Sequence, residues 1–296
     1  MRSWLLVPAE DEEKLEDAAS SGADVVVLDL DQARSESARV DGRERAADWM
    51  RNHRQQVLQG QNFARWVRIS PIESEHWRED LRAALAGAAE GIFLPAVPGP
   101  AYVQQLASEV YEVEQRSGIA HGATQIIPLV ASRPQNVLTL GQFAENVQPR
   151  LGGFSWESAI LAEAVGARRE HSSTGEWFGA MAYARSKIVL LAKACGLLAL
   201  ESAQPATMSD EAFANLAMVA RADGFTGMFA NSAAQVKAIN AAFSPTEGEL
   251  TRAEGIIAQF TSNPNADHVR MGNRVLNRSD LQRARQMLET VNMGVG

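Results

Sequence analysis

The chain has 296 residues, a formal net charge of −8 and 46% hydrophobic residues. The hydrophobic content supports a sizeable core and excludes a disordered chain, while the negative charge disfavours nucleic-acid partners, whose phosphates attract basic surfaces. No apolar stretch reaches the roughly 18 residues that a transmembrane helix needs, and no signal-peptide pattern opens the chain. We therefore expect a soluble cytoplasmic protein with a small-molecule ligand and no membrane partner.

Short β-branched or aliphatic runs alternate with amphipathic helical segments from the N-terminus onward. The runs predicted as strands are Trp4 to Val7, Val25 to Leu30, Ala64 to Ile69, Ile92 to Leu94, Ile126 to Val130, Gly153 to Trp156, Leu197 to Leu200 and Met228 to Ala230. The helical segments between them include Glu10 to Ser20, Arg43 to Leu58, Tyr102 to Gln115, Ala182 to Cys195 and Glu211 to Asp223. Alternating strands and helices form parallel βαβ units. The pattern predicts an α/β fold with a single (β/α)8 TIM-type barrel over residues 1–245.

Residues 246–296 are predicted to form a C-terminal helical extension. Thr246 and Glu249 have the spacing of a capping box, which predicts a helix from Glu249 to Phe260. The segment Thr261 to Asn265 is rich in turn-forming residues, and a final helix is predicted from about Ser279 to Val291. We expect this extension to pack on the barrel or on a neighbouring subunit.

Cysteine and histidine offer little chemistry in this sequence. Cys195 is the single cysteine and ends a helical run before Gly196, so it forms no intrachain disulfide and is expected to pack as a small apolar residue in a reducing compartment. The histidines lack the close spacing of zinc ligands and are expected on the surface: His53, His76, His121, His171 and His268.

Active sites of such barrels lie at the C-terminal ends of the strands. This rule selects a short list of candidates: Pro8, Asp29, Asp31, Arg68, Pro95, Ala96, Ala131 to Arg133, Trp156 to Ile160, Glu201 and Asn231 to Ala233.

Several of these segments, read in order, carry a family resemblance. They are Arg2 to Pro8, Gly22 to Asp31, Val67 to Ser70, Pro149 to Trp156, Ala164 to Ala167, Asp223 to Gly227 and Asn240 to Pro245. Together they resemble the citrate lyase beta-subunit-like branch of the HpcH/HpaI aldolase superfamily. Members of that branch cleave carbon–carbon bonds of CoA thioesters such as citryl-CoA and malyl-CoA with magnesium, so the resemblance implies a lyase that uses magnesium.

The sequence departs from the family pattern at the chemical positions. The family's two magnesium-ligating carboxylates match Ser132 and Ile160, a neutral hydroxyl and an aliphatic side chain, so we expect no metal ligand at either position. Further family residues are replaced by Ala9, Gln32, Ala96, Asn231 and, in the tail, Asn277 in place of a catalytic acid. The resemblance thus implies a degenerate active site.

The remaining polar residues give the candidate site. Arg68 matches the family's ligand for the substrate carboxylate, although it is also placed to pair with Asp29 or Asp31 across adjacent strand ends. Catalytic candidates are Arg68, Asp31 and Glu157, and substrate-binding candidates are Arg68, Pro95, Ser132 and Glu201, of which Glu201 is equally suited to capping the next loop. Lys14 and Arg39 match basic positions that face CoA in relatives, but they are also typical of solvated helix faces.

Three interpretations of function remain open at this point. The first is a carbon–carbon lyase of a 3-hydroxyacyl-CoA, in which Arg68 holds a carboxylate and remaining oxygens such as those of Asp31 and Glu157 hold the metal. The second is a non-catalytic carboxylate-binding barrel that acts as a sensor or as an assembly partner of an active paralogue. The third is a metal-free activity that uses Ser132, Arg133 and Glu157, for which no histidine base is evident. The resemblance also implies a homo-oligomer, a trimer or hexamer, with a small carboxylate or acyl-CoA ligand.

Overall fold

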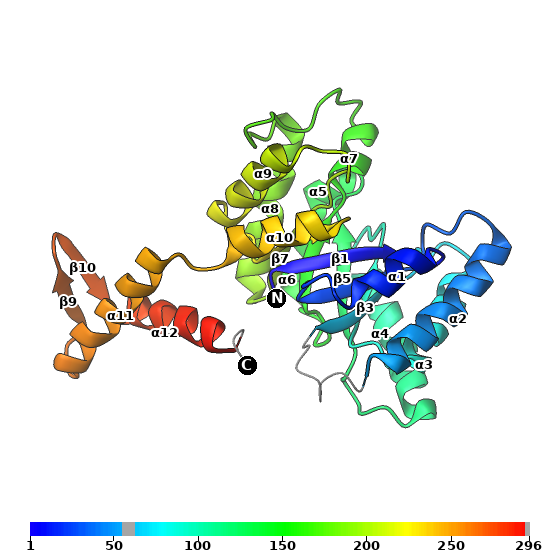
Figure 1. The fold of residues 1–296 in the computed structure, drawn as a ribbon, viewed down its shortest axis with the longest axis horizontal. Coiled ribbons are helices and arrows are strands. Elements are labelled where there is room, and N and C mark those ends of the chain that lie inside the picture. Colours follow the sequence, from blue (N-terminus) through cyan, green and yellow to red (C-terminus); the bar gives the residue numbers. More distant parts are fainter. Residues whose placement is uncertain (55–62, 294–296) are drawn as a thin grey trace. The chain divides into compact units, whose positions relative to one another are not determined.

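The computed structural model describes residues 1–54 and 63–293 (Figure 1), and its strands form a closed parallel barrel in the order β1 to β8. The strands are β1 (Ser3–Pro8), β2 (Val25–Asp29), β3 (Ala64–Arg68), β4 (Gly91–Leu94), β5 (Gln125–Val130), β6 (Gly153–Trp156), β7 (Leu198–Glu201) and β8 (Gly227–Ala230). The single (β/α)8 barrel predicted from the sequence is confirmed.

Helices follow the strands around the barrel. They are α1 (Glu12–Ala18), α2 (Glu36–Asn52), α3 (Trp77–Ala86), α4 (Pro100–Ser117), α5 (Pro134–Thr139), α6 (Gln142–Glu145), α7 (Ser158–Ala164), α8 (Gly179–Cys195), α9 (Asp210–Ala222) and α10 (Ala233–Phe243). The second helix begins at Glu36, ahead of the predicted Arg43, because the Ser35 hydroxyl accepts a hydrogen bond from the Ala38 N–H and caps the first turn. Its predicted end at Leu58 lies outside the described residues.

Aromatic rings fill the interior of the barrel. Trp4, Trp66 and Phe93 have ring centroids 5.1 to 5.5 Å apart, and Phe93 meets Phe229 from the opposite side of the barrel at 4.9 Å. Gly91 makes room for this packing, since a Cβ there would lie 2.4 Å from the Trp66 ring. The interior below the strand ends is therefore a solid core, and ligand access is confined to the mouth.

The opposite faces of the strands pack against the helices. Val26 and Leu28 of β2 and Phe154 and Trp156 of β6 belong to this outer core. Cys195 ends α8, packs against the same core, and is followed by Gly196 with a left-handed φ of 69°. The expectation that Cys195 packs as a small apolar residue is confirmed. None of the helices in the described part of the chain is long and apolar enough to cross a bilayer.

The chain divides into two compact units, Met1–Phe243 and Ser244–Gly296. The second unit contains α11 (Glu247–Ser262), the antiparallel strands β9 (His268–Met271) and β10 (Arg274–Asn277), and α12 (Arg278–Met293), around a small core of its own. The capping box of Thr246 and Glu249 is present. The hairpin was not predicted, and it explains how α11 and α12 are joined. The packing of this extension on the barrel or on a neighbouring subunit stays a prediction.

Candidate ligand site at the barrel mouth

A pocket of about 460 Å³ opens at the C-terminal ends of the strands. Its lining includes Pro8 from β1, Asp29 and Arg68 from β2 and β3, Glu157 and Ile160 after β6, and Asn231 after β8. These candidates lie far apart in the sequence and are brought together by closure of the barrel.

Asp29 and Arg68 form a buried ion pair across two neighbouring strands. The register places Asp29 opposite Arg68, and strand alternation turns both side chains into the barrel above the aromatic core. Arg68 Nε donates to Asp29 Oδ1 at 2.9 Å, and Nη2 donates to Oδ2 at 2.7 Å. The side chains are 8% and 3% exposed. This bidentate pair is the alternative that the sequence left open for Arg68.

Glu157 is the second partner of Arg68. Because Phe154 and Trp156 face the outer core, alternation turns Glu157 towards the mouth. Arg68 Nη1 donates to Glu157 Oε1 at 2.9 Å, and the Glu157 side chain keeps 28% of its surface exposed. One guanidinium therefore bridges the ends of β2 and β6.

The carboxyls of Glu157 and Asp31 at the mouth have raised pKa values, because the effect of burial exceeds the opposing effect of Arg68. Burial raises the pKa of Glu157, Arg68 opposes the rise, and Asp31 and Asp29 add to it. Burial likewise raises the pKa of Asp31, where Arg68 acts against Asp29. Burial alone would lower the pKa of Arg68, but Asp29 and Glu157 hold it above its usual value. Carboxyls with raised pKa values in a pocket are candidates for acid or base roles.

Asp31 contacts the Arg68–Asp29 ion pair through its backbone. Its backbone N–H donates to Asp29 Oδ1 at 3.0 Å, and its side chain contacts Gln32 at 3.5 Å. Asp31 thus orients Asp29 through the backbone, while its carboxylate acts on Arg68 through charge.

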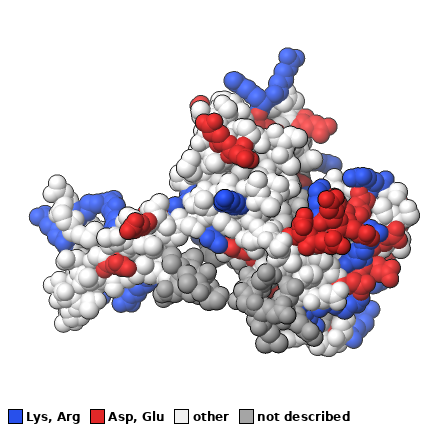
Figure 2. All heavy atoms as spheres, viewed as in Figure 1, with Lys and Arg blue, Asp and Glu red and all other residues white. Residues whose placement is uncertain are grey.

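The two candidate CoA contacts are engaged elsewhere. Arg39 Nη1 donates to the Leu30 carbonyl at 3.1 Å and to Ser70 Oγ at 3.0 Å, which ties together the segments after β2 and β3. Lys14 is 58% exposed and pairs with Asp11 at 3.0 Å. Figure 2 shows acidic side chains gathered over α1 and α2, where Lys14 lies. These contacts favour structural and solvated roles for both residues, and their contact with CoA stays a prediction.

Glu201 faces away from the mouth, and its predicted contact with substrate is not supported. Since Leu200 belongs to the barrel interior, alternation turns Glu201 towards α8. Its Oε2 accepts from Arg185 Nε at 2.7 Å, its Oε1 accepts from Trp156 Nε1 at 2.8 Å, and its side chain is 1% exposed. Sequence reasoning missed the partner Arg185, although the alternation of Leu198 and Leu200 signals the direction of Glu201.

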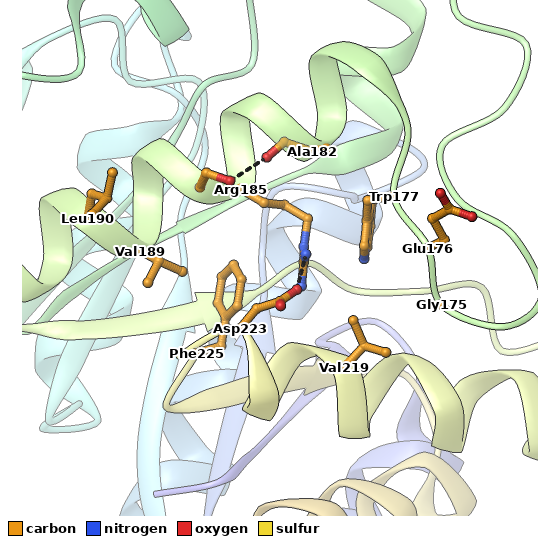
Figure 3. A pocket seen from close by; sticks show the side chains of 11 residues that line it. Gly175, Glu176, Trp177, Ala182, Arg185, Val189, Leu190, Val219, Asp223 and Phe225 are labelled. Atoms are coloured by element: carbon orange, nitrogen blue, oxygen red, sulfur yellow. Dashed lines mark hydrogen bonds and ion pairs between the residues drawn. The ribbon is translucent and has the colours of Figure 1, made fainter.

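The same arginine lines a second pocket of about 530 Å³ beside α8 and α9. Figure 3 shows Arg185 reaching from α8 between the rings of Trp177 and Phe225 towards Asp223, to which it donates at 2.7 Å. Its guanidinium carbon lies 4.8 and 4.9 Å from the two ring centroids. Its charge is balanced by Glu201 and Asp223, so we assign this cluster to stability of the barrel wall.

The remaining substrate-binding candidates lie at strained strand ends. Pro95 and Ser132 are buried, and neither lines the mouth pocket. Their neighbours Ala96 and Ala131 have φ values of 54° and 62°, in the left-handed region that disfavours alanine. Backbone strain of this kind is often found at functional sites.

A magnesium ion finds poor ligands at this mouth. Ser132 offers a neutral hydroxyl, and Ile160 offers no donor and is 45% exposed. The carboxylates of Asp29 and Glu157, which line the pocket, are already bonded to a guanidinium. Across residues 1–54 and 63–293, no cluster of three or more His, Cys, Asp or Glu side chains has metal-site geometry. The residues present do not fit the group that the family resemblance implies.

Comparisons with known proteins agree with this fold. The HpcH/HpaI aldolase/citrate lyase family matches residues 2–233. Citrate lyase subunit beta of Leuconostoc mesenteroides subsp. cremoris is 22% identical over 293 residues, which cover 98% of this chain and 93% of that protein. The (3S)-malyl-CoA thioesterase of Cereibacter sphaeroides is 27% identical over 261 residues, which cover 88% of this chain and 82% of that protein.

Solved structures share this fold. Protein CitE from Mycobacterium tuberculosis, in complex with magnesium, acetoacetate and coenzyme A, superposes with a TM-score of 0.72. It is 23% identical, and the match covers 97% of both chains. At this identity the likeness establishes the fold alone.

Proposed function

The chain belongs to the HpcH/HpaI aldolase/citrate lyase family, in its citrate lyase beta-like branch. We propose that it binds a small carboxylate at the barrel mouth and that its magnesium-dependent lyase activity is weakened or lost. The ligand is a free carboxylate or one carried on a CoA thioester. The protein then acts as a sensor or as an assembly partner of an active relative.

One observation carries the proposal: Arg68 is buried in the wall of the 460 Å³ mouth pocket. A guanidinium presents a planar fork of donors that matches a carboxylate. Asp29 holds this fork in place with two bonds and acts as a positioning residue. The acetoacetate and coenzyme A bound by the Mycobacterium tuberculosis relative support the ligand class.

Loss of lyase activity follows from the donor set. In a family that uses magnesium, the metal supplies electrostatic stabilisation of a developing enolate, worth several kcal/mol. Ser132 and Ile160 hold no such ion, and losing about 4 kcal/mol of transition-state stabilisation slows a reaction about a thousandfold.

Calorimetric binding of acetoacetate to the wild type and to Arg68→Lys tests the proposal. Lysine keeps the charge that Asp29 needs but removes the fork, so we expect acetoacetate affinity to fall at least about tenfold. An unchanged affinity in a folded Arg68→Lys protein overturns the proposed role of Arg68.

Residual carbon–carbon cleavage is the second candidate function. Glu157 in the mouth pocket favours it, because burial raises the pKa of its carboxyl and a raised pKa makes a carboxyl better suited to acid catalysis. An assay of malyl-CoA and citryl-CoA cleavage decides between the two functions. Turnover that disappears in Glu157→Gln would support the lyase, and absence of turnover supports the binding role.

A further inference from the structure

We propose that Glu157 is a built-in competitor for Arg68 and so determines which ligands the mouth accepts. A ligand carboxylate takes the place of the Glu157 carboxylate on the Arg68 guanidinium. A neutral ligand brings no carboxylate to replace it, so the competition with Glu157 does not favour its binding. The inference rests on the proposed function and adds a specificity-determining residue to it.

The two acid partners of Arg68 are held unequally. Asp29 takes Nε and Nη2 with two hydrogen bonds, and its side chain is 3% exposed. Glu157 takes Nη1 with one bond of 2.9 Å, and its side chain is 28% exposed. Since two buried hydrogen bonds stabilise a contact more than one partly exposed bond does, Glu157 is the partner that a ligand displaces.

The backbone around Glu157 permits this release. Glu157 is the residue before α7, with φ of −123° and ψ of 98°, and its side chain does not cap the helix. Its backbone carbonyl accepts from Leu161 N–H and anchors the helix start. The carboxylate therefore swings away by side-chain rotation alone, with α7 left in place.

Charge adds to the competition. Asp29, Asp31 and Glu157 place three carboxylates around the one guanidinium of Arg68. The next cation, Arg39, acts on Asp31 and has its Nη1 committed to Leu30 and Ser70. An arriving carboxylate meets net repulsion while Glu157 stays ionised, and removal of Glu157 reduces this repulsion by one negative charge.

Paired ligands and variants test the inference. Acetoacetate and its neutral analogue acetoacetamide are titrated by calorimetry into the wild type, Glu157→Ala and Glu163→Ala. Glu163 is an exposed acid of α7, the helix that follows Glu157, so its variant makes the same change in net charge away from the pocket. We expect Glu157→Ala to bind acetoacetate about tenfold more tightly than the other two proteins, with acetoacetamide affinity changed by less than about threefold.

A second variant guards against a packing defect. Glu157→Gln keeps the shape but removes the charge, so its acetoacetate affinity is expected between those of the wild type and Glu157→Ala. Equal acetoacetate binding by all proteins overturns the competition and leaves the proposed binding role intact. Failure of acetoacetate to bind even to the folded Glu157 variants overturns both.

Discussion

Arg68 shows how a buried charge constrains its surroundings. An unpaired guanidinium above an aromatic core is strongly destabilising, so a counter-charge such as Asp29 is required for the fold itself. Glu157 is a further acid, and its partial exposure separates it from that structural duty. Arg68 and Asp29 therefore form a structural pair, whereas the contact between Arg68 and Glu157 is available for function.

The Glu201–Arg185 pair is predicted to stabilise the wall without affecting the mouth. Glu201→Gln leaves the buried Arg185 with Asp223 as its remaining acid, so we expect the free energy of unfolding to fall by about 3 kcal/mol. Urea denaturation measures this loss, with the exposed Glu211→Gln as control. Acetoacetate affinity is expected to be unchanged, and a large loss of affinity would contradict our assignment of Glu201.

Glu157 is predicted to make stability depend on pH. Its pKa is raised in the folded chain, so the fold binds this proton more tightly than the unfolded chain does. Stability from this group is therefore present below the ordinary pKa of a glutamate, near 4.3, and is lost as pH rises through the raised value. Urea denaturation from pH about 4 to about 7 should show Glu157→Gln gaining stability over the wild type as pH rises. A difference that is constant with pH contradicts this.

Sequence reasoning placed Arg68 and Glu157 at the barrel mouth but did not predict that they contact each other. Asp29 was named as a partner of Arg68 because adjacent strand ends are local neighbours in a barrel. The contact with Glu157 spans 89 residues and depends on barrel closure, which local patterns do not encode. For Glu201 the loop-capping alternative agrees with the structure, where its Oε1 accepts from the Ser202 N–H at 2.9 Å, and the alternation of Leu198 and Leu200 could have decided between the alternatives.

At the scale of elements, the strands were the most predictable features. Each predicted strand overlaps an observed one, because buried parallel strands are short continuous apolar runs. The start of α2 was missed because the polar segment 36–42 lacks an apolar stripe, although Ser35 marks the cap. The hairpin of β9 and β10 was missed despite the Gly272-Asn273 pair between its strands, which is a hairpin turn signal.

The strained ends of β4 and β5 give a prediction about backbone. Ala96→Gly and Ala131→Gly remove a left-handed alanine, so we expect each to raise the free energy of unfolding by about 0.5 to 1 kcal/mol. Chemical denaturation measures the gain. As a control, Ala194→Gly on the exposed face of α8 should lower it by up to about 1 kcal/mol. A lower free energy of unfolding in all three variants would contradict backbone strain at Ala96 and Ala131.

At the scale of the molecule, the chain combines a barrel with a separately packed unit. The unit Ser244–Gly296 has its own apolar core around Ile256, Phe260 and Leu276. The trimer or hexamer that the family resemblance implies stays a prediction, in which we expect the extension to serve contacts between subunits.

This expectation is testable by light scattering coupled to size-exclusion chromatography. The full chain, of 32.1 kDa per subunit, is predicted to elute as a trimer or hexamer. A chain ending at Phe243 is predicted to elute as a smaller species. A monomeric full chain would contradict the role of the extension.

The most direct test of our central claim, a carboxylate site that works without magnesium, is calorimetry of acetoacetate binding with magnesium and with a chelator. We predict the same affinity under both conditions, because Arg68 and not a metal holds the carboxylate, and an affinity at least about tenfold lower in Arg68→Lys. Acetoacetate binding that requires magnesium, together with magnesium-dependent cleavage of malyl-CoA, would contradict it.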